Sequence, residues 1–112
     1  MNFLSRIFLS SVGVMLSAYL LEGVYVKGFW SALLFSFLLS ILNYTIKPLL
    51  IILTVPLTVF TLGLFLFFIN TLIIMIAAGL VGGLIIDSFG WAFLFSLLLS
   101  VINTLIFDIA KR

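Results

Sequence analysis

Long apolar segments separated by single charged residues extend along the whole chain. The charged side chains leave four long uncharged segments, at 7–21, 28–46, 48–86 and 88–107. A transmembrane helix needs about 20 mostly apolar residues, and the third segment is nearly twice that length. The apolar runs lack the strict alternation of membrane strands. The pattern predicts an all-α integral membrane protein with four transmembrane helices, at about 3–21, 29–47, 60–81 and 89–108.

The second half of the sequence repeats the first. Residues 28–43 read GFWSALLFSFLLSILN, and residues 88–103 read SFGWAFLFSLLLSVIN. The whole segment 3–43 aligns without gaps with segment 63–103, and the identical positions include Ser, Asn and Gly as well as Leu and Phe. This self-similarity predicts a duplicated pair of helices.

The repeat defines the organisation expected for a single membrane domain over 1–112. It comprises repeat one at 3–43, an apolar connector at 44–62, repeat two at 63–103 and a short C-terminal end at 104–112. Because each repeat would cross the membrane twice, both copies are expected to point the same way. The expected symmetry is a pseudo-two-fold axis along the membrane normal, unlike the inverted repeats of many transporters.

Positive charges predict the orientation, because Lys and Arg concentrate on the cytoplasmic side. Arg6, Lys47, Lys111 and Arg112 share one side in this topology, and Lys27 lies on the other. Both termini and the connector are therefore expected to be cytoplasmic. The loops at 21–28 and 82–88 carry Gly and a charge, as expected for polar turns.

Small and polar residues form stripes at helical spacing. One stripe, with spacings of 4, 4 and 3, occurs in the second span and again in the fourth, and a sparser one links the first and third spans. The stripe residues are Ser10, Ser17, Ala32, Ser36, Ser40, Asn43, Asn70, Ala77, Ala92, Ser96, Ser100 and Asn103. Small residues let membrane helices approach closely, and Ser or Asn side chains hydrogen-bond between them. We interpret the stripes as helix-packing faces; the alternative is the lining of a pore or transport path.

Asn70 lies about two turns inside its predicted span, where an unpaired amide is costly. We expect it to hydrogen-bond to the stripe of a neighbouring span.

The connector is the segment that composition explains least. Its notable residues are Lys47, Pro48, Thr54, Pro56, Thr58, Thr61 and Gly63. Proline breaks or kinks a helix, which favours a kinked, interfacial or re-entrant element. The alternative is that the second span ends near Lys47 and that Pro56 begins a long third helix. In either case Lys47 is expected to extend towards the lipid headgroups.

The other charges and the aromatic residues fit membrane boundaries. Glu22, Lys27 and Asp87 are interpreted as charges of the outer loops. An aromatic belt of Tyr19, Tyr25, Trp30 and Trp91 flanks those loops. At the C-terminal end, Asp108 is expected to pair with Lys111 and Arg112.

Composition excludes most chemistry. The chain has no Cys and no His, and its three carboxylates are far apart and close to the ends of apolar runs. Thiolate chemistry and histidine ligation are therefore absent, and no catalytic group of residues can be assembled. We predict no enzyme activity, cofactor, metal site or nucleic-acid partner.

The 43–70 segment carries a family resemblance. The residues NYTIKPLL from Asn43, LTVPLT from Leu53, TLGLF from Thr61 and then Asn70 resemble the signature of phage holin family 4, superfamily IV. This family includes YvlD-like small four-span bacterial membrane proteins, and GFWSA from Gly28 also fits its pattern. The order differs at Ser88-Phe89-Gly90-Trp91. The resemblance implies a multi-pass protein of the bacterial cytoplasmic membrane and supplies no catalytic residues.

Three functions follow as hypotheses. The favoured one is a non-catalytic membrane protein that acts through helix packing with itself or another membrane protein, in envelope maintenance or stress. The first alternative is a holin-like lesion former that permeabilises the cytoplasmic membrane. The second is a small channel or transporter, which is weakened by the lack of an ionisable residue in the middle of any span.

Overall fold

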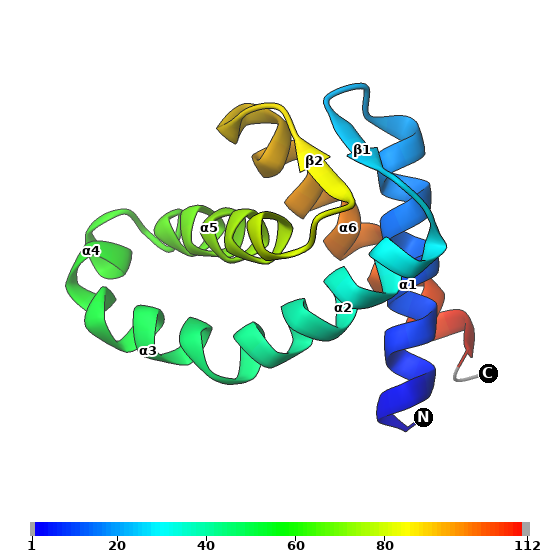
Figure 1. The fold of residues 1–112 in the computed structure, drawn as a ribbon. Helices are drawn as coiled ribbons and strands as arrows, with labels where there is room; N and C mark the ends of the chain where they lie inside the picture. Colours follow the sequence, from blue (N-terminus) through cyan, green and yellow to red (C-terminus); the bar gives the residue numbers. More distant parts are fainter. Residues whose placement is uncertain (1, 111–112) are drawn as a thin grey trace.

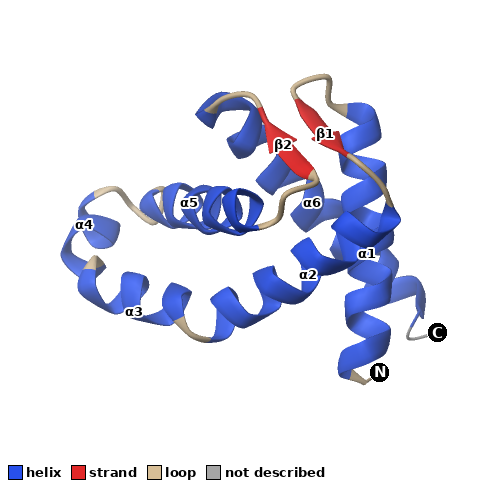
Figure 2. Cartoon of the chain, viewed as in Figure 1, coloured by secondary structure: helices blue, strands red, loops and turns tan. Residues whose placement is uncertain are grey.

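The computed structural model describes residues 2–110 and is built almost entirely from helices (Figures 1 and 2). The elements in chain order are α1 (Phe3–Leu20), β1 (Val24–Val26), α2 (Phe29–Tyr44), α3 (Ile46–Leu53), α4 (Val55–Phe60), α5 (Phe65–Leu80), β2 (Leu84–Ile86) and α6 (Phe89–Ala110). Each of the four predicted apolar spans is largely helical. An α-helix satisfies its own backbone hydrogen bonds, as an apolar surrounding requires.

The helices differ in whether they are long enough to cross a membrane. Helices α1 and α6 are long and apolar enough to do so, and α2 with α3 passes the same test only as a pair bent by 42°. Helix α5 has 16 residues, which is fewer than the roughly 20 that a bilayer core needs. By length and composition, two helices within the described residues are long enough to cross a membrane, or three if α2 and α3 together form one bent span.

The two outer loops contain an element that the hydropathy pattern did not predict. Strands β1 and β2 pair antiparallel, with Tyr25 opposite Ile85 at the centre of the pair. The pairing brings the predicted loops 21–28 and 82–88 together at one end of the molecule (Figure 1). These loops are therefore a joined structure and not two separate polar turns.

The four longest helices form a ring around the core. Helices α1 and α5 each pack against both α2 and α6. Across the centre of the ring, Phe35 of α2 meets Phe95 of α6, with ring centroids 5.9 Å apart and both side chains fully buried. Val14, Ile73 and the strand residue Leu84 are also buried in the core. The core is thus made of residues from all four helices and the strand pair.

The connector forms two short helices, α3 and α4, which bear no buried residues. Threonines mark its breaks: Thr54 ends α3, and its hydroxyl donates to the Leu50 carbonyl at 2.6 Å. Pro48 and Pro56 lie in the first turns of α3 and α4, where the missing N–H breaks no helical hydrogen bond. The helix that contains Pro56 ends at Phe60 and α5 begins at Phe65, so a long third helix starting at Pro56 is wrong, and the connector is kinked.

Candidate functional site

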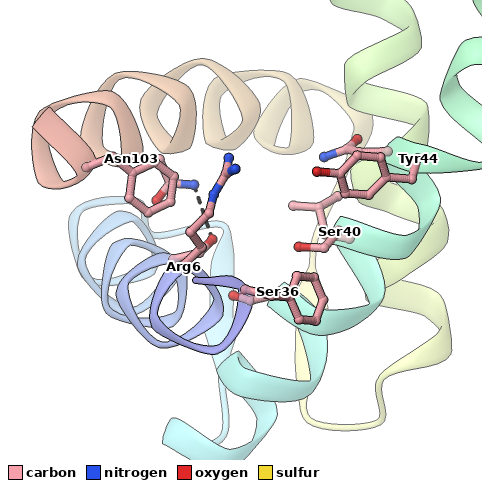
Figure 3. Close-up of a pocket in the computed structure, with 10 residues that line it drawn as sticks. Arg6, Ser36, Ser40, Tyr44 and Asn103 are labelled. Carbon is pink, nitrogen blue, oxygen red and sulfur yellow. Dashed lines mark hydrogen bonds between the residues drawn. The ribbon is translucent and has the colours of Figure 1, made fainter. Parts of the chain in front are cut away.

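A polar cleft opens between α1, α2 and α6 at the end of the molecule away from the strands. Its volume is about 190 Å³. The lining residues are Phe3, Arg6, Ser10, Ser36, Leu39, Ser40, Asn43, Tyr44, Asn103 and Phe107. Figure 3 shows Arg6 and Asn103 on one side of the opening, facing Ser36, Ser40 and Tyr44 on the other. The cleft therefore draws hydrogen-bonding side chains from all three helices.

Helical spacing explains why the three helices present polar groups together. Residues three, four or seven positions apart share one face of a helix. Helix α1 contributes Arg6 and Ser10, four positions apart, and α6 contributes Asn103 and Phe107 at the same spacing. Helix α2 contributes its predicted stripe from Ser36 onward. Stripes recognised separately in the sequence therefore meet in one cleft.

One hydrogen bond joins two of these stripes. The Asn103 side-chain amide donates to the Ser10 hydroxyl at 3.2 Å. On the other side of Asn103, its Oδ1 atom lies against Gly13 so closely that a Cβ at that position would collide with it. The lack of a side chain at Gly13 therefore lets the Asn103 side chain of α6 reach the backbone of α1.

Two other polar atoms of the cleft lack a partner in the described part of the chain. These are the Ser36 hydroxyl and the Asn103 Oδ1 atom, both buried without a hydrogen bond. Buried polar groups are normally satisfied. The cleft therefore offers hydrogen-bonding capacity that the described residues do not use.

The charge of the cleft comes from Arg6. Its guanidinium carbon lies 5.4 Å from the centre of the Phe107 ring, a cation–π distance. No Asp or Glu is among the described residues that line the cleft. The described lining therefore places one cation among hydroxyl and amide groups.

Asn70 has a different partner from the one predicted. Its Oδ1 atom accepts a hydrogen bond from the Lys47 ammonium at 3.2 Å. The partner therefore lies on the connector helix α3, and the expected bond to a stripe is wrong. This hydrogen bond directs the Lys47 side chain towards α5, and the position of Lys47 relative to the lipid headgroups stays a prediction. The two residues are too far apart in the chain for helical periodicity to have linked them.

The remaining stripe residues differ in burial. Buried are Ser17, Ala32, Ser36, Ala77, Ala92 and Ser96; partly buried are Ser10, Ser40, Asn70 and Asn103; exposed are Asn43 and Ser100. The middle of each stripe is thus buried between helices, and its cleft-end residues are more accessible. In the connector, Lys47, Thr54, Thr58, Thr61 and Gly63 are partly buried, whereas Pro48 and Pro56 are exposed.

The strand end contains crossed contacts that the sequence reasoning missed. The Lys27 amide donates to the Gly83 carbonyl at 2.6 Å, and the Asp87 amide donates to the Gly23 carbonyl at 2.9 Å. Gly23 leaves room for the Trp91 indole, which a Cβ would strike. Trp91 is therefore partly buried against the core and is not simply an aromatic-belt residue. The occurrence of Gly at equivalent positions of the two repeats was the available signal.

The carboxylates form no metal-binding group. Across residues 2–110, no three His, Cys, Asp or Glu side chains lie close enough together to hold an ion. The predicted pairing of Asp108 involves Lys111 and Arg112, which lie outside the described residues.

Comparison with known proteins places the chain in a family. The model of a family described as "Mycobacterial 4 TMS phage holin, superfamily IV" matches residues 1–105. The chain is also 46% identical over 87 residues to the "Uncharacterized membrane protein YvlD" of Bacillus subtilis (strain 168), which covers 77% of this chain and 73% of that protein. No solved structure matches the chain. The resemblance based on the 43–70 segment is therefore confirmed.

Proposed function

The chain belongs to the four-span phage holin family of superfamily IV, and from this membership we propose that it is a non-lytic membrane protein that acts through helix contacts. Its contacts would be with lipid and with a second copy or another membrane protein. The proposed location is the bacterial cytoplasmic membrane, and the proposed role is in envelope maintenance or stress. The similarity to a Bacillus membrane protein supports the location.

The burial of the stripes carries this proposal. Ser36 and Ser96 are each only 1% exposed, and Ala32 and Ala92 are fully buried. A lesion former needs a polar helix face that becomes exposed to water on assembly. Here the small and polar residues already pack inside one chain, and the helices expose many large apolar side chains. This arrangement favours a stable membrane unit over a pore wall.

The proposed topology is four spans in two parallel repeats, with both termini cytoplasmic. Strands β1 and β2 occupy equivalent positions of the two repeats, as do the starts of α2 at Phe29 and of α6 at Phe89. The strand pairing also brings the two loops to one end, as parallel repeats would require. Helix α5 would need residues 61–64, the turn before it, to reach a headgroup region. These observations support the duplication and the shared direction of its halves.

The test is inducible expression in bacterial cells with a membrane-potential dye. Steady growth and unchanged potential at high expression are expected. Prompt depolarisation with lysis would contradict the proposal. If Ser36→Leu combined with Ser96→Leu then abolished the lysis, the holin alternative would be favoured. Ser100→Leu is the matched control because Ser100 is exposed on α6. Depolarisation without lysis would also contradict the proposal, in favour of a channel.

A further inference from the structure

The cleft between α1, α2 and α6 has the properties of an anion site. Arg6, Asn43 and Tyr44 are exposed at its opening, whereas Ser36 and Leu39 are buried inside it. The cleft is therefore accessible from one side and closed on the other. Its described lining contains one cation, the hydroxyls of Ser36 and Ser40, and no carboxylate. Asn103 is not among the available donors, because its amide N–H is already bonded to Ser10 and its Oδ1 atom is an acceptor.

A phosphate group is the ligand that fits this set of donors. The guanidinium of arginine offers several N–H groups in a plane and binds phosphate oxygens in pairs. The buried Ser36 hydroxyl has no partner in the described chain, so it is free to donate to an oxygen that reaches the closed end. Ser40 lies one helical turn further along the same face and supplies a second hydroxyl (Figure 3). A volume of about 190 Å³ exceeds what a single water occupies by about an order of magnitude.

The cleft lies at the end of α1, where a lipid headgroup could reach it if α1 crosses the membrane. Arg6 lies in the first turns of α1, which begins at Phe3, and helix ends are where charged side chains meet the membrane surface. Phe3, Leu39 and Phe107 give the cleft apolar walls beside its donors. A phosphate attached to a glycerol and acyl chains would therefore find both polar and apolar contacts.

We propose that the cleft binds a phosphate group, held by Arg6 at the opening and by Ser36 and Ser40 inside, and supplied by an anionic phospholipid or by free phosphate. This inference goes beyond the proposed function and does not depend on it. A lesion former or a channel with the same cleft would bind the same group.

Thermal unfolding of the purified full-length chain in neutral detergent micelles tests the proposal. A ligand that binds only the folded state raises the melting temperature. The probes are micelles doped with phosphatidylglycerol, micelles doped with phosphatidylcholine, and inorganic phosphate at constant ionic strength. Phosphatidylglycerol or inorganic phosphate is expected to raise the melting temperature, and phosphatidylcholine to raise it less. A response to inorganic phosphate identifies the free anion as a source, whereas a response to phosphatidylglycerol alone identifies the lipid.

Variants show whether the response comes from the cleft. Arg6→Gln is expected to weaken the apparent affinity at least about tenfold, since charge-assisted contacts to phosphate are the strong ones. Lys27→Gln removes the same charge at the strand end and is expected to respond like wild type. Ser36→Ala keeps the net charge and is expected to weaken binding severalfold. If Arg6→Gln does not fold, Arg6→Lys replaces it, and its binding is expected to be weaker than wild type because a lysine cannot contact phosphate oxygens in pairs.

Two results would overturn the proposal. One is an equal loss of apparent affinity for the phosphate probes in Arg6→Gln and Lys27→Gln. That result would mean that the anion is attracted by net charge alone. The other is a wild-type melting temperature that neither phosphatidylglycerol nor inorganic phosphate changes.

Discussion

The phenyl rings of Phe35 and Phe95 meet at the centre of the molecule, with centroids 5.9 Å apart and ring planes at 50°. The two residues occupy equivalent positions of the two repeats. Helices α2 and α6 lie opposite each other in the ring, so this contact closes the core between them. Among the described residues, it is the one aromatic contact in which both rings are fully buried.

Loss of this contact should destabilise the fold strongly. Phe35→Ala is expected to lower the free energy of unfolding by about 3–5 kcal/mol, because it removes a buried ring and leaves a cavity. The measurement is unfolding in mixed micelles with added sodium dodecyl sulfate. Phe60→Ala is the control, since Phe60 is 88% exposed. Equal effects of the two substitutions would show that the central contact does not hold the helices together.

Gly23 should tolerate no side chain while Trp91 is present. Gly23→Ala places a Cβ against the Trp91 indole and is expected to cost about 1–3 kcal/mol, as overpacking does. In a protein that already carries Trp91→Ala, Gly23→Ala should cost less stability than it does in the wild type. Thermal unfolding of the wild type, the two single variants and the double variant would show the difference. Gly79→Ala serves as control, because no atom lies near its Cβ position and alanine favours the helix by up to about 1 kcal/mol. Purely additive effects of the Gly23 and Trp91 substitutions would contradict the close contact.

The hydrogen bond between Lys47 and Asn70 should appear as coupling between α3 and α5. In a double-mutant cycle with Lys47→Met and Asn70→Leu, we expect a coupling energy of about 0.5–2 kcal/mol. Unfolding of the four proteins in micelles gives the value. Lys47→Met combined with Thr104→Val is the control pair and should show none, because the Thr104 hydroxyl bonds within α6. A value near zero for the first pair would mean that the connector does not dock through this bond.

The turn between α4 and α5 should respond to residues that favour a left-handed backbone. Leu62 has φ 58° and Gly63 has φ 90°. A left-handed backbone conformation costs about 1–2 kcal/mol at a residue other than Gly, and the cost is smaller for Asn. Leu62→Asn is therefore expected to raise the melting temperature and Gly63→Ala to lower it. Val59→Asn reports the effect of the polar side chain alone, and a Leu62→Asn protein that behaves like it would argue against strain at this turn.

Membrane topology can be read by labelling single cysteines, since the chain has no cysteine of its own. Glu22→Cys and Asp87→Cys are expected to react with a membrane-impermeant maleimide in intact cells. Asn2→Cys and Leu62→Cys are expected to react only after the cells are made permeable. All four positions are exposed, so burial does not hide them. Labelling of Leu62→Cys from outside would contradict the parallel repeats and the cytoplasmic connector.

The sequence was informative for features that are set within a single helix or turn. Proline indicated that the connector is kinked, because it removes a backbone donor whatever surrounds it. The spacing of Ser36 and Ser40 indicated a shared face because helical periodicity is a local property. The strand pair was missed, because such short strands within loops carry too little pattern and depend on a partner in the other repeat.

The sequence by itself determined that this protein is apolar, helical and a member of its family, because hydropathy and motif are carried by the chain whatever its packing. Only the tertiary structure decided which helix each polar face would meet. It paired Lys47 with Asn70, placed Trp91 over Gly23, and gathered Arg6, Ser36 and Asn103 around one cleft. The physical reason is that periodicity defines the face of a helix, whereas the neighbour of that face depends on how the helices cross and how the connector bends.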